Sequence, residues 1–126
     1  MEVEEDVYTY APANNGAGPM WCGGSTCLVR SGDRLFASGL ETVLDAKPLN
    51  NCRWMLFERR ASGWERIYLD AEGRTREPAP LAAFADGRVF VSTNPSIDPK
   101  PGGGPARPDV LEFHVANLQA GPTSLV

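Results

Sequence analysis

The chain has 126 residues, a mass of 13.6 kDa and a formal charge of −4, with 42% hydrophobic and 22% charged residues. This length suits one ordinary domain, and the composition is that of a folded chain. The acidic balance, without a basic stripe, disfavours nucleic acid as a partner. A membrane partner is also disfavoured, because no apolar run reaches the roughly 20 residues that a membrane helix needs.

The opening stretch, MEVEEDVYTY, has neither the basic nor the apolar region of a signal peptide. As written, the chain is expected to be soluble. A leader lost before Met1 would place the protein outside the cell or in the periplasm, and otherwise it would be cytoplasmic. Residues 7–12 carry Val7, Tyr8 and Tyr10, which predict a strand that joins a neighbouring sheet.

The next segments are typical of antiparallel hairpins. TCLVRS and RLFASGLE flank the turn GD, while RWMLFERR and WERIYLD flank ASG, where glycine tolerates the positive φ of a tight turn. The second half repeats this order, with PLAAFA and RVFVST around DG, then VLEFHVA and a short last segment, TSLV. Short helical turns in ETVLDAK or LAAFA would not change the fold class. We therefore predict two successive four-stranded antiparallel units, at 25–70 and 80–126.

The two units also share a short phrase. SGDRLFASG returns as ADGRVFVST at an offset of 54 residues, and further on WMLFER matches VLEFHV after a slip of two. A period near 50 is typical of propellers and other repeat arrays, and a four-strand meander with a buried middle is typical of a propeller blade. The sequence therefore predicts an all-β chain of about two blades of a β-propeller. A small β-sandwich is the alternative, because about seven short strands could also stack as two sheets.

Two blades are fewer than the roughly 4 to 8 of a closed propeller. The expected partners are therefore further blades, either in a longer chain or in other copies, with residues 7–12 completing a neighbouring blade. The stop after TSLV, inside a predicted strand, favours a truncated chain. A second kind of function, a non-enzymatic module that binds a protein or itself, follows from the exposed edges at both ends.

In a four-strand meander, the connections after the second and fourth strands leave from the same end of the sheet. Long, polar connectors occur at these places, so we expect one loop-rich face to carry function. In NNGAGPMWCGG, Trp21 could stack on a sugar face or pack against the next blade. In LETVLDAKPLNNCR, the polar side chains suit carbohydrate or carboxylate recognition, or they hold the loop together through Asx turns. The candidate ligand-binding residues in these two loops are Trp21, Glu41, Asp45, Lys47, Asn51 and Arg53.

A third connector, EGRTREP, adds Arg74, Arg76 and Glu77. The two arginines could clamp a carboxylate, or all three charges could simply be solvated in a turn. A glycoside hydrolase needs two acids at its scissile bond, and the acids predicted to share this face are Glu41, Asp45 and Glu77.

Other chemistry has little support. Cys22, Cys27 and Cys52 allow three disulfide pairings, and His114 stands alone in a predicted strand, where a structural role is expected. No metal-ligand spacing, catalytic triad or phosphate-binding glycine loop occurs, so no metal and no cofactor are expected.

The hairpin LFERRASGWERI is similar to the place where sialidase-like propellers carry the Asp-box, a Ser-x-Asp-x-Gly-x-Thr-Trp turn. With REPAPLAAFADGRVFVS, residues 7–118 resemble uncharacterised bacterial BNR-repeat or exo-α-sialidase-like proteins. Ser62 stands where the Asp-box aspartate would fall, no Thr precedes Trp64, and the Arg-Ile-Pro signature is absent. The resemblance implies a propeller that recognises a glycan, with any glycoside hydrolysis needing residues from blades outside this chain. It assigns no catalytic residue here.

Overall fold

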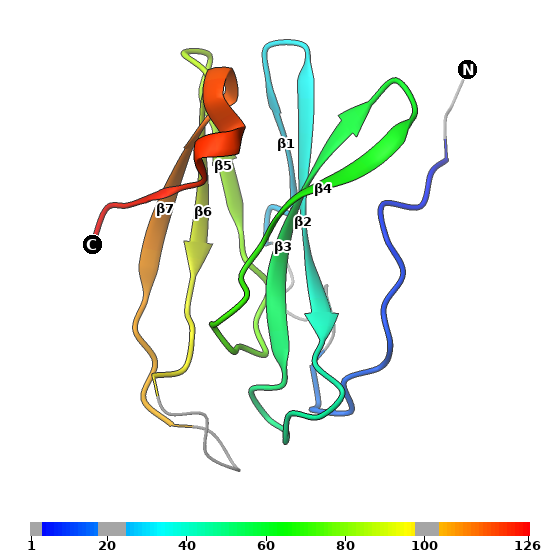
Figure 1. Ribbon diagram of the computed structural model, residues 1–126, viewed down its shortest axis with the longest axis vertical. Coiled ribbons are helices and arrows are strands. Elements are labelled where there is room, and N and C mark those ends of the chain that lie inside the picture. Colours follow the sequence, from blue (N-terminus) through cyan, green and yellow to red (C-terminus); the bar gives the residue numbers. More distant parts are fainter. Residues whose placement is uncertain (1–3, 18–24, 98–103) are drawn as a thin grey trace.

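The chain forms two four-stranded antiparallel sheets, seen side by side in Figure 1. The computed structural model describes residues 4–17, 25–97 and 104–126. In each sheet the strands follow one another in chain order, so the predicted all-β class and the two meanders are confirmed. The strands of the first sheet are β1 (Leu28–Ser31), β2 (Arg34–Thr42), β3 (Cys52–Arg60) and β4 (Gly63–Leu69). Those of the second sheet are β5 (Leu81–Ala83), β6 (Arg88–Thr93), β7 (Asp109–His114) and β8 (Thr123–Ser124).

Tight turns set the hairpins of the first sheet. Gly32 has φ +58° in the turn between β1 and β2, and Gly63 has φ +124° where β4 begins. Side chains with a Cβ rarely adopt these backbone angles, so glycine permits the two tight reversals. The four strands of the first sheet follow from these turns and from alternating apolar residues.

The connection between β7 and β8 departs from the prediction. The stretch VLEFHVA was expected to remain a strand, but β7 ends at His114 and residues Val115–Ala120 form a short 3-10 helix, η1. Val115 still donates its N–H to the carbonyl of Gly87, at 2.8 Å. In the described ranges of the chain, no helix is long and apolar enough to cross a membrane.

The ladder register corrects the alignment of the two halves. Phe36 lies opposite Glu58 in the first sheet, and Phe90 lies opposite Glu112 in the second, so both members of the pair are 54 residues apart. The predicted slip of two residues is therefore wrong. A shift of two leaves every side chain on the same face of a strand, so the hydrophobic pattern cannot distinguish the two alignments.

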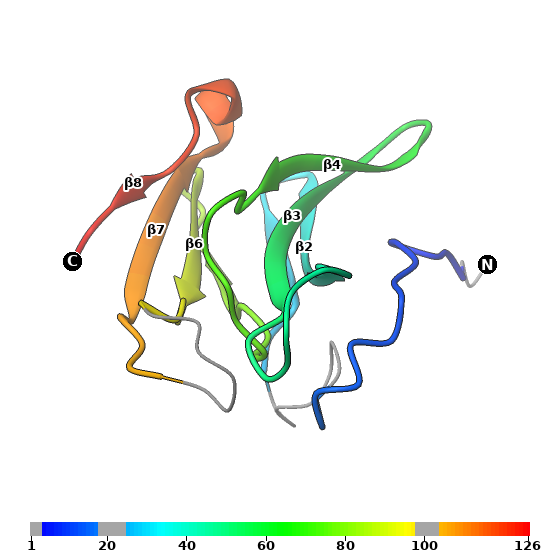
Figure 2. The ribbon, with the colours of Figure 1, turned by 60° about the horizontal axis from the view of Figure 1, so that its bottom comes forward.

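The core lies between the sheets, which approach each other unevenly. At the β1 and β5 edges, Leu81 donates its N–H to the carbonyl of Thr26 at 2.7 Å, and Ser31 Oγ donates to the carbonyl of Phe84 at 2.9 Å. Towards the outer strands, aromatic rings separate the sheets. The ring centroids lie 5.0 Å apart for Trp54 and Tyr68, 5.4 Å for Tyr68 and Phe113, and 6.4 Å for Trp54 and Phe113. The two sheets therefore form a wedge, narrow at β1 and β5 (Figure 2).

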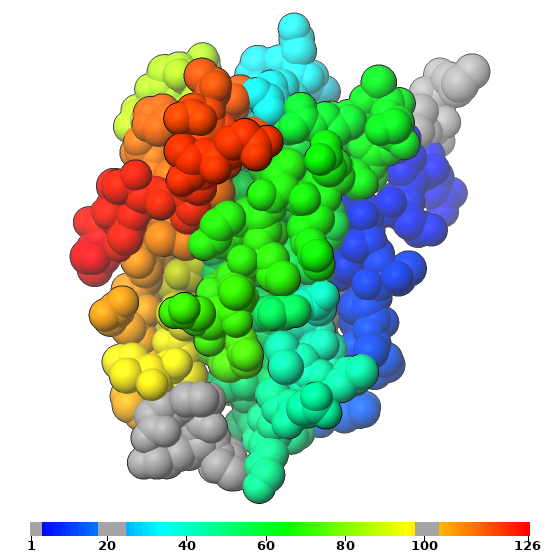
Figure 3. Space-filling model, viewed as in Figure 1, coloured from blue at the N-terminus to red at the C-terminus, as the bar shows by residue number. Residues whose placement is uncertain are grey.

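The N-terminal segment lies against the other face of the first sheet, on the side away from the second sheet (Figures 1 and 3). Tyr8 stacks on Phe57, with ring centroids 5.2 Å apart, and its Oη accepts the N–H of Leu40 at 3.0 Å. Residues 7–12 form no strand in this chain, because side chains rather than a backbone ladder hold them. That they complete a neighbouring blade stays a prediction.

Candidate functional site: the loop-end groove

Three connectors gather at one end of the molecule, the bottom of Figure 1: residues 43–51, residues 70–80, and the described parts of the third connector, 94–97 and 104–108. Cys52 and Thr75 exchange backbone hydrogen bonds of 2.9 and 2.8 Å, which tie the middle connector to the first sheet. Ser96 donates its N–H to the carbonyl of Arg74 at 2.7 Å, and this bond ties the middle connector to the connector that follows β6 of the second sheet. The described parts of the long loops therefore meet at one face, as the meander order predicts.

A groove of about 290 Å³ opens where these connectors meet, and we call it the loop-end groove. Most of its side chains are polar, and they come from both sheets' connectors. It is lined by Leu49, Asn50, Thr75, Arg76, Glu77, Asn94, Ser96, Gly104 and Ala106. The groove thus offers amide, hydroxyl, guanidinium and carboxylate groups within one small volume.

Local hydrogen bonds fix the wall of the groove. Thr75 is buried, and its Oγ1 accepts the N–H of Glu77 at 3.0 Å. Asn94, which follows β6, places its Nδ2 3.5 Å from Glu77 Oε2. Because Thr75 is also paired with Cys52, the backbone that presents Arg76 and Glu77 is held on both sides. A fixed backbone lowers the cost of ordering these side chains around a ligand.

Asn51, a predicted ligand-binding residue, is instead a buried part of the scaffold, only 4% exposed. Its Nδ2 donates to the carbonyl of Ala13 at 2.8 Å, while its Oδ1 accepts Asn15 Nδ2 at 2.8 Å. Asn15 Nδ2 also donates to the carbonyl of Leu49 at 3.0 Å. Buried amides need such partners, so Asn51 holds the N-terminal segment to the loop and does not face a ligand.

Cys52 lies next to this amide cluster and is buried. Burial raises the pKa of its thiol, because a low-dielectric surrounding disfavours the thiolate. Cys27 and Cys52 are both free thiols, so they are not paired with each other. Cys22, the third member of the predicted pairings, lies outside the described residues.

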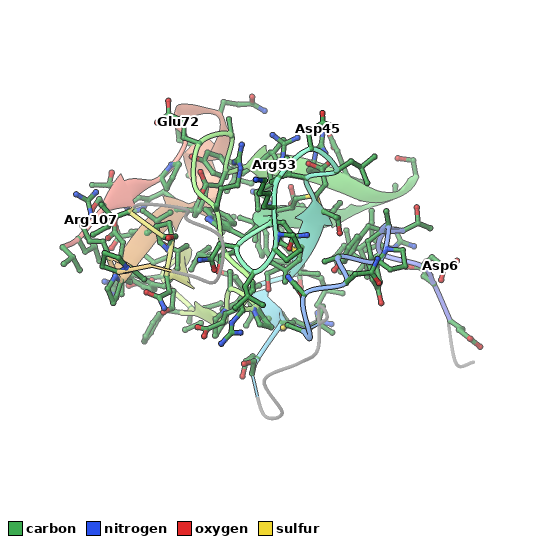
Figure 4. The ribbon with its side chains drawn as sticks, turned by 90° about the horizontal axis from the view of Figure 1, so that it is seen from below. Asp6, Asp45, Arg53, Glu72 and Arg107 are labelled. Atoms are coloured by element: carbon green, nitrogen blue, oxygen red, sulfur yellow. The ribbon has the colours of Figure 1, made fainter. Side chains whose placement is uncertain are left out.

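Glu41 and Arg53 stand where the predicted strands and the predicted loop overlap, and the structure places them in β2 and β3, directly opposite each other. Arg53 Nε donates to Glu41 Oε2 at 2.5 Å, and Arg66 Nη1 lies 3.4 Å from Glu41 Oε1. Glu41 and Arg53 therefore neutralise each other on the sheet. Asp45 and Lys47, in the turn that follows, are exposed, and Figure 4 shows Asp45 at the edge of this end.

The predicted arginine pair is divided. Arg74 Nη1 donates to three backbone carbonyls of its own turn, the shortest being that of Gly73 at 2.8 Å. Arg76 lines the loop-end groove together with Glu77. Trp21 lies outside the described residues, so its role at this face stays a prediction.

The three candidate acids lie in different settings. Glu41 is held by arginines on the first sheet, Asp45 is exposed in a turn, and Glu77 faces the groove. Glu41 and Glu77 thus have different partners, arginines for Glu41 and Asn94 for Glu77. Across the described parts of the chain, no group of three or more His, Cys, Asp or Glu side chains could hold a metal ion.

Sequence reasoning missed several residues of the groove. Thr75, Asn94 and Ser96 carry no motif and occupy ordinary loop positions. The signal that could have found Asn94 is its place directly after β6, at the end where β2 and β4 also stop. Comparisons with protein-family models, with curated proteins and with solved structures returned no match to this chain.

Proposed function

We propose that the chain supplies two neighbouring blades of a β-propeller, and that the loop-end groove between them binds a small polar ligand of the carbohydrate class. The wedge supports the blade assignment. Neighbouring blades meet at their first strands around a central axis and diverge outwards, so small contacts at β1 and β5 with bulky rings beyond them fit this geometry.

The observation that carries the ligand proposal is the composition of the groove. Sugar hydroxyls both donate and accept hydrogen bonds, and Asn94, Arg76 and Glu77 together supply amide, cationic and anionic partners. A volume of about 290 Å³ is at the lower limit of the roughly 300–1,000 Å³ of small-molecule sites, which favours one sugar unit over an oligosaccharide. The likeness to sialidase-like propellers agrees with this ligand class. Hydrolysis is not proposed for this chain alone.

The test is isothermal titration calorimetry with a panel of neutral and acidic monosaccharides. We expect at least one to bind, and Arg76→Ala and Asn94→Ala to weaken that binding at least tenfold, or about 1.4 kcal/mol. The matched control is Arg74→Ala, which removes the same charge two residues earlier in the chain. The Arg74 side chain donates to the backbone of its own turn. The proposal fails if no sugar binds, or if Arg74→Ala weakens binding as much as Arg76→Ala does. Thermal unfolding of each variant separates lost binding from lost structure.

A further inference from the structure

The first sheet carries a group of four side chains on the face that the second sheet covers. We call Arg34, Phe36, Glu58 and Arg60 the covered cluster. Phe36 is 0% exposed and Glu58 is 1% exposed. Arg34 forms an ion pair with Glu58, and its guanidinium carbon lies 5.6 Å from the centre of the Phe36 ring. Arg60 Nη2 lies 2.7 Å from Glu58 Oε2.

The covered cluster also reaches across to the second sheet. Arg34 Nη1 donates to the carbonyl of Val115 at 2.5 Å. An apolar ring, a buried acid and a crossing arginine therefore form one side of the contact between the sheets.

The second sheet repeats this cluster at the equivalent positions, 54 residues on. We call Arg88, Phe90, Glu112 and His114 the open cluster. The guanidinium carbon of Arg88 lies 5.4 Å from the centre of the Phe90 ring, and His114 Nε2 lies 2.7 Å from Glu112 Oε1, as Arg60 lies beside Glu58. Arg88 differs from Arg34 in its ion pair, which is with Asp86 at 2.8 Å. This face is turned away from the first sheet, so Phe90 is only half-buried and nothing in the described chain covers it as Phe36 is covered.

The first sheet carries the opposite half of the same contact. The second sheet rests on the first through Leu81, Val89 and Val91. The ladder registers identify the equivalent residues of the first sheet. Leu28 pairs with Ala37 as Leu81 pairs with Val91, and Leu35 lies two residues before Ala37 as Val89 lies two before Val91. Instead of packing against another sheet, these three line a groove of about 780 Å³, which we call the side groove. The N-terminal segment forms one wall of it and covers Ala37, whereas Leu28 is 56% exposed.

We propose that a second copy of this chain docks here: the open cluster of one copy packs into the side groove of the next and repeats the internal contact between the two sheets. This rests on the proposed two-blade unit. The open cluster lies on the second sheet, and the side groove lies beside the N-terminal segment. Figure 1 shows the second sheet and the N-terminal segment on opposite sides of the molecule. Such a contact joins two different surfaces, so it is head-to-tail and can close a ring.

Two features of the surfaces support a copy of this chain as the occupant. The side groove is mostly apolar, with Leu28 56% exposed. Next to the open cluster, Phe84 is 50% exposed, and its ring centroid lies 5.5 Å from that of Phe90. Leaving both surfaces uncovered would expose large apolar groups on both sides of the molecule.

The contact between copies is expected to be weaker than the internal one. Val110 takes the place of Leu56 on the exposed face of the second sheet, so the contact between copies buries less apolar surface and depends on concentration.

The number of copies follows from the blade count. A closed propeller has roughly 4 to 8 blades, so a ring of two-blade chains would contain about two to four copies.

The test is the solution mass by light scattering over a range of concentrations. We expect the intact chain to reach a discrete mass of about two to four copies. Phe90→Glu or Phe84→Glu should leave a monomer by blocking one surface, and Leu28→Glu should do so by blocking the other. The matched control is Leu44→Glu, which places the same charge on an apolar residue that is 79% exposed in a loop outside both surfaces. Circular dichroism confirms that each variant folds.

Mixing decides whether the contact is head-to-tail. Phe90→Glu retains its side groove and Leu28→Glu retains its open cluster, so an equal mixture should form a dimer that grows no further. A monomeric intact chain at all concentrations would overturn the proposal, as would variants that keep the full mass or a mixture that stays monomeric. Sugar binding measured on the monomeric variants tests the loop-end groove separately, because that groove lies within one chain.

Discussion

The covered cluster and the open cluster share a register, an arginine over a phenylalanine ring and an acid beside the basic residue two positions on, but Arg34 pairs with Glu58 whereas Arg88 pairs with Asp86. They differ in what lies on them. In the first sheet Phe36 and Glu58 are sealed by the second sheet, whereas in the second sheet the side chains of Glu112 and His114 are 18% and 58% exposed. Local sequence therefore reproduces the geometry of the cluster, while the neighbouring sheet decides how much that cluster contributes to stability.

The largest difference is expected for the two phenylalanines. Phe36→Ala should lower the free energy of unfolding by about 3–5 kcal/mol, because it leaves a cavity in the contact between the sheets. Phe90→Ala should cost about 1 kcal/mol, because a half-buried ring leaves no closed cavity. Urea unfolding at concentrations low enough to keep the chain monomeric measures both. Equal costs would show that the two rings are equally buried.

Substituting the acid of each cluster should give a smaller difference in the free energy of unfolding. Glu58→Gln removes the charge that two arginines surround and should cost about 3 kcal/mol, because Arg34 and Arg60 then keep their charges beside a buried neutral amide. Glu112→Gln removes a partly exposed pair and should cost less than about 1 kcal/mol. The midpoint of urea unfolding, with an unchanged slope, reports the difference. A larger loss for Glu112→Gln would reverse the comparison.

Gly39 tests the N-terminal segment that lies on the first sheet. A Cβ at this position would lie 2.5 Å from Tyr8 Cε1, so Gly39→Ala should displace the Tyr8 ring and cost about 1–3 kcal/mol. Combining it with Tyr8→Ala should recover part of that loss, since the clash is then gone. A double-mutant cycle in urea measures this coupling. Independent, additive effects would mean that Tyr8 does not rest on Gly39.

The smallest effect concerns pH at the edge of the side groove. Arg59 donates to both carboxylate oxygens of Glu5, at 2.6 and 2.5 Å, and this hydrogen bonding lowers the pKa of Glu5 below its ordinary value of 4.5. A lowered pKa in the folded state means that the contact is fully present above pH 4.5 and is lost as the pH falls through the lower value.

The protection factors of residues 5–10, which correct for the intrinsic pH dependence of amide exchange, should therefore fall in acid, while those of the sheets stay high. Glu5→Gln should abolish this pH dependence and leave the protection of residues 5–10 low throughout. If the protection of residues 5–10 in Glu5→Gln still changed with pH in the same range, a group other than Glu5 would be responsible.

The strands themselves could be predicted because each carries its own signal. RLFASGLE and RWMLFERR are rich in strand-forming residues and are bounded by glycine turns, and these local preferences agree with the final fold. The alignment of the two halves could not be predicted, because a slip of two leaves every side chain on its face. The predicted strands RLFASGLE and RWMLFERR already reached Glu41 and Arg53, but the sequence did not show that these two residues pair across the sheet and therefore do not serve a loop site.

The groove was harder to predict than the sheets. Arg76 and Glu77 were foreseen as polar residues before an inner strand, but Asn51 has the same composition signal and is buried in the scaffold. Whether a loop amide faces solvent or the interior depends on the path of other segments, here the N-terminal one that carries Asn15 and Ala13. No local pattern contains that information.

The sequence by itself determined the strands, their turns and the repetition of one four-stranded unit, because backbone propensity and alternation act over a few residues. The tertiary structure alone decided which copy of the repeated cluster is buried, which polar residues meet in the loop-end groove and which apolar face remains open. These outcomes depend on the packing of one sheet against another, and packing joins residues that are distant in the chain.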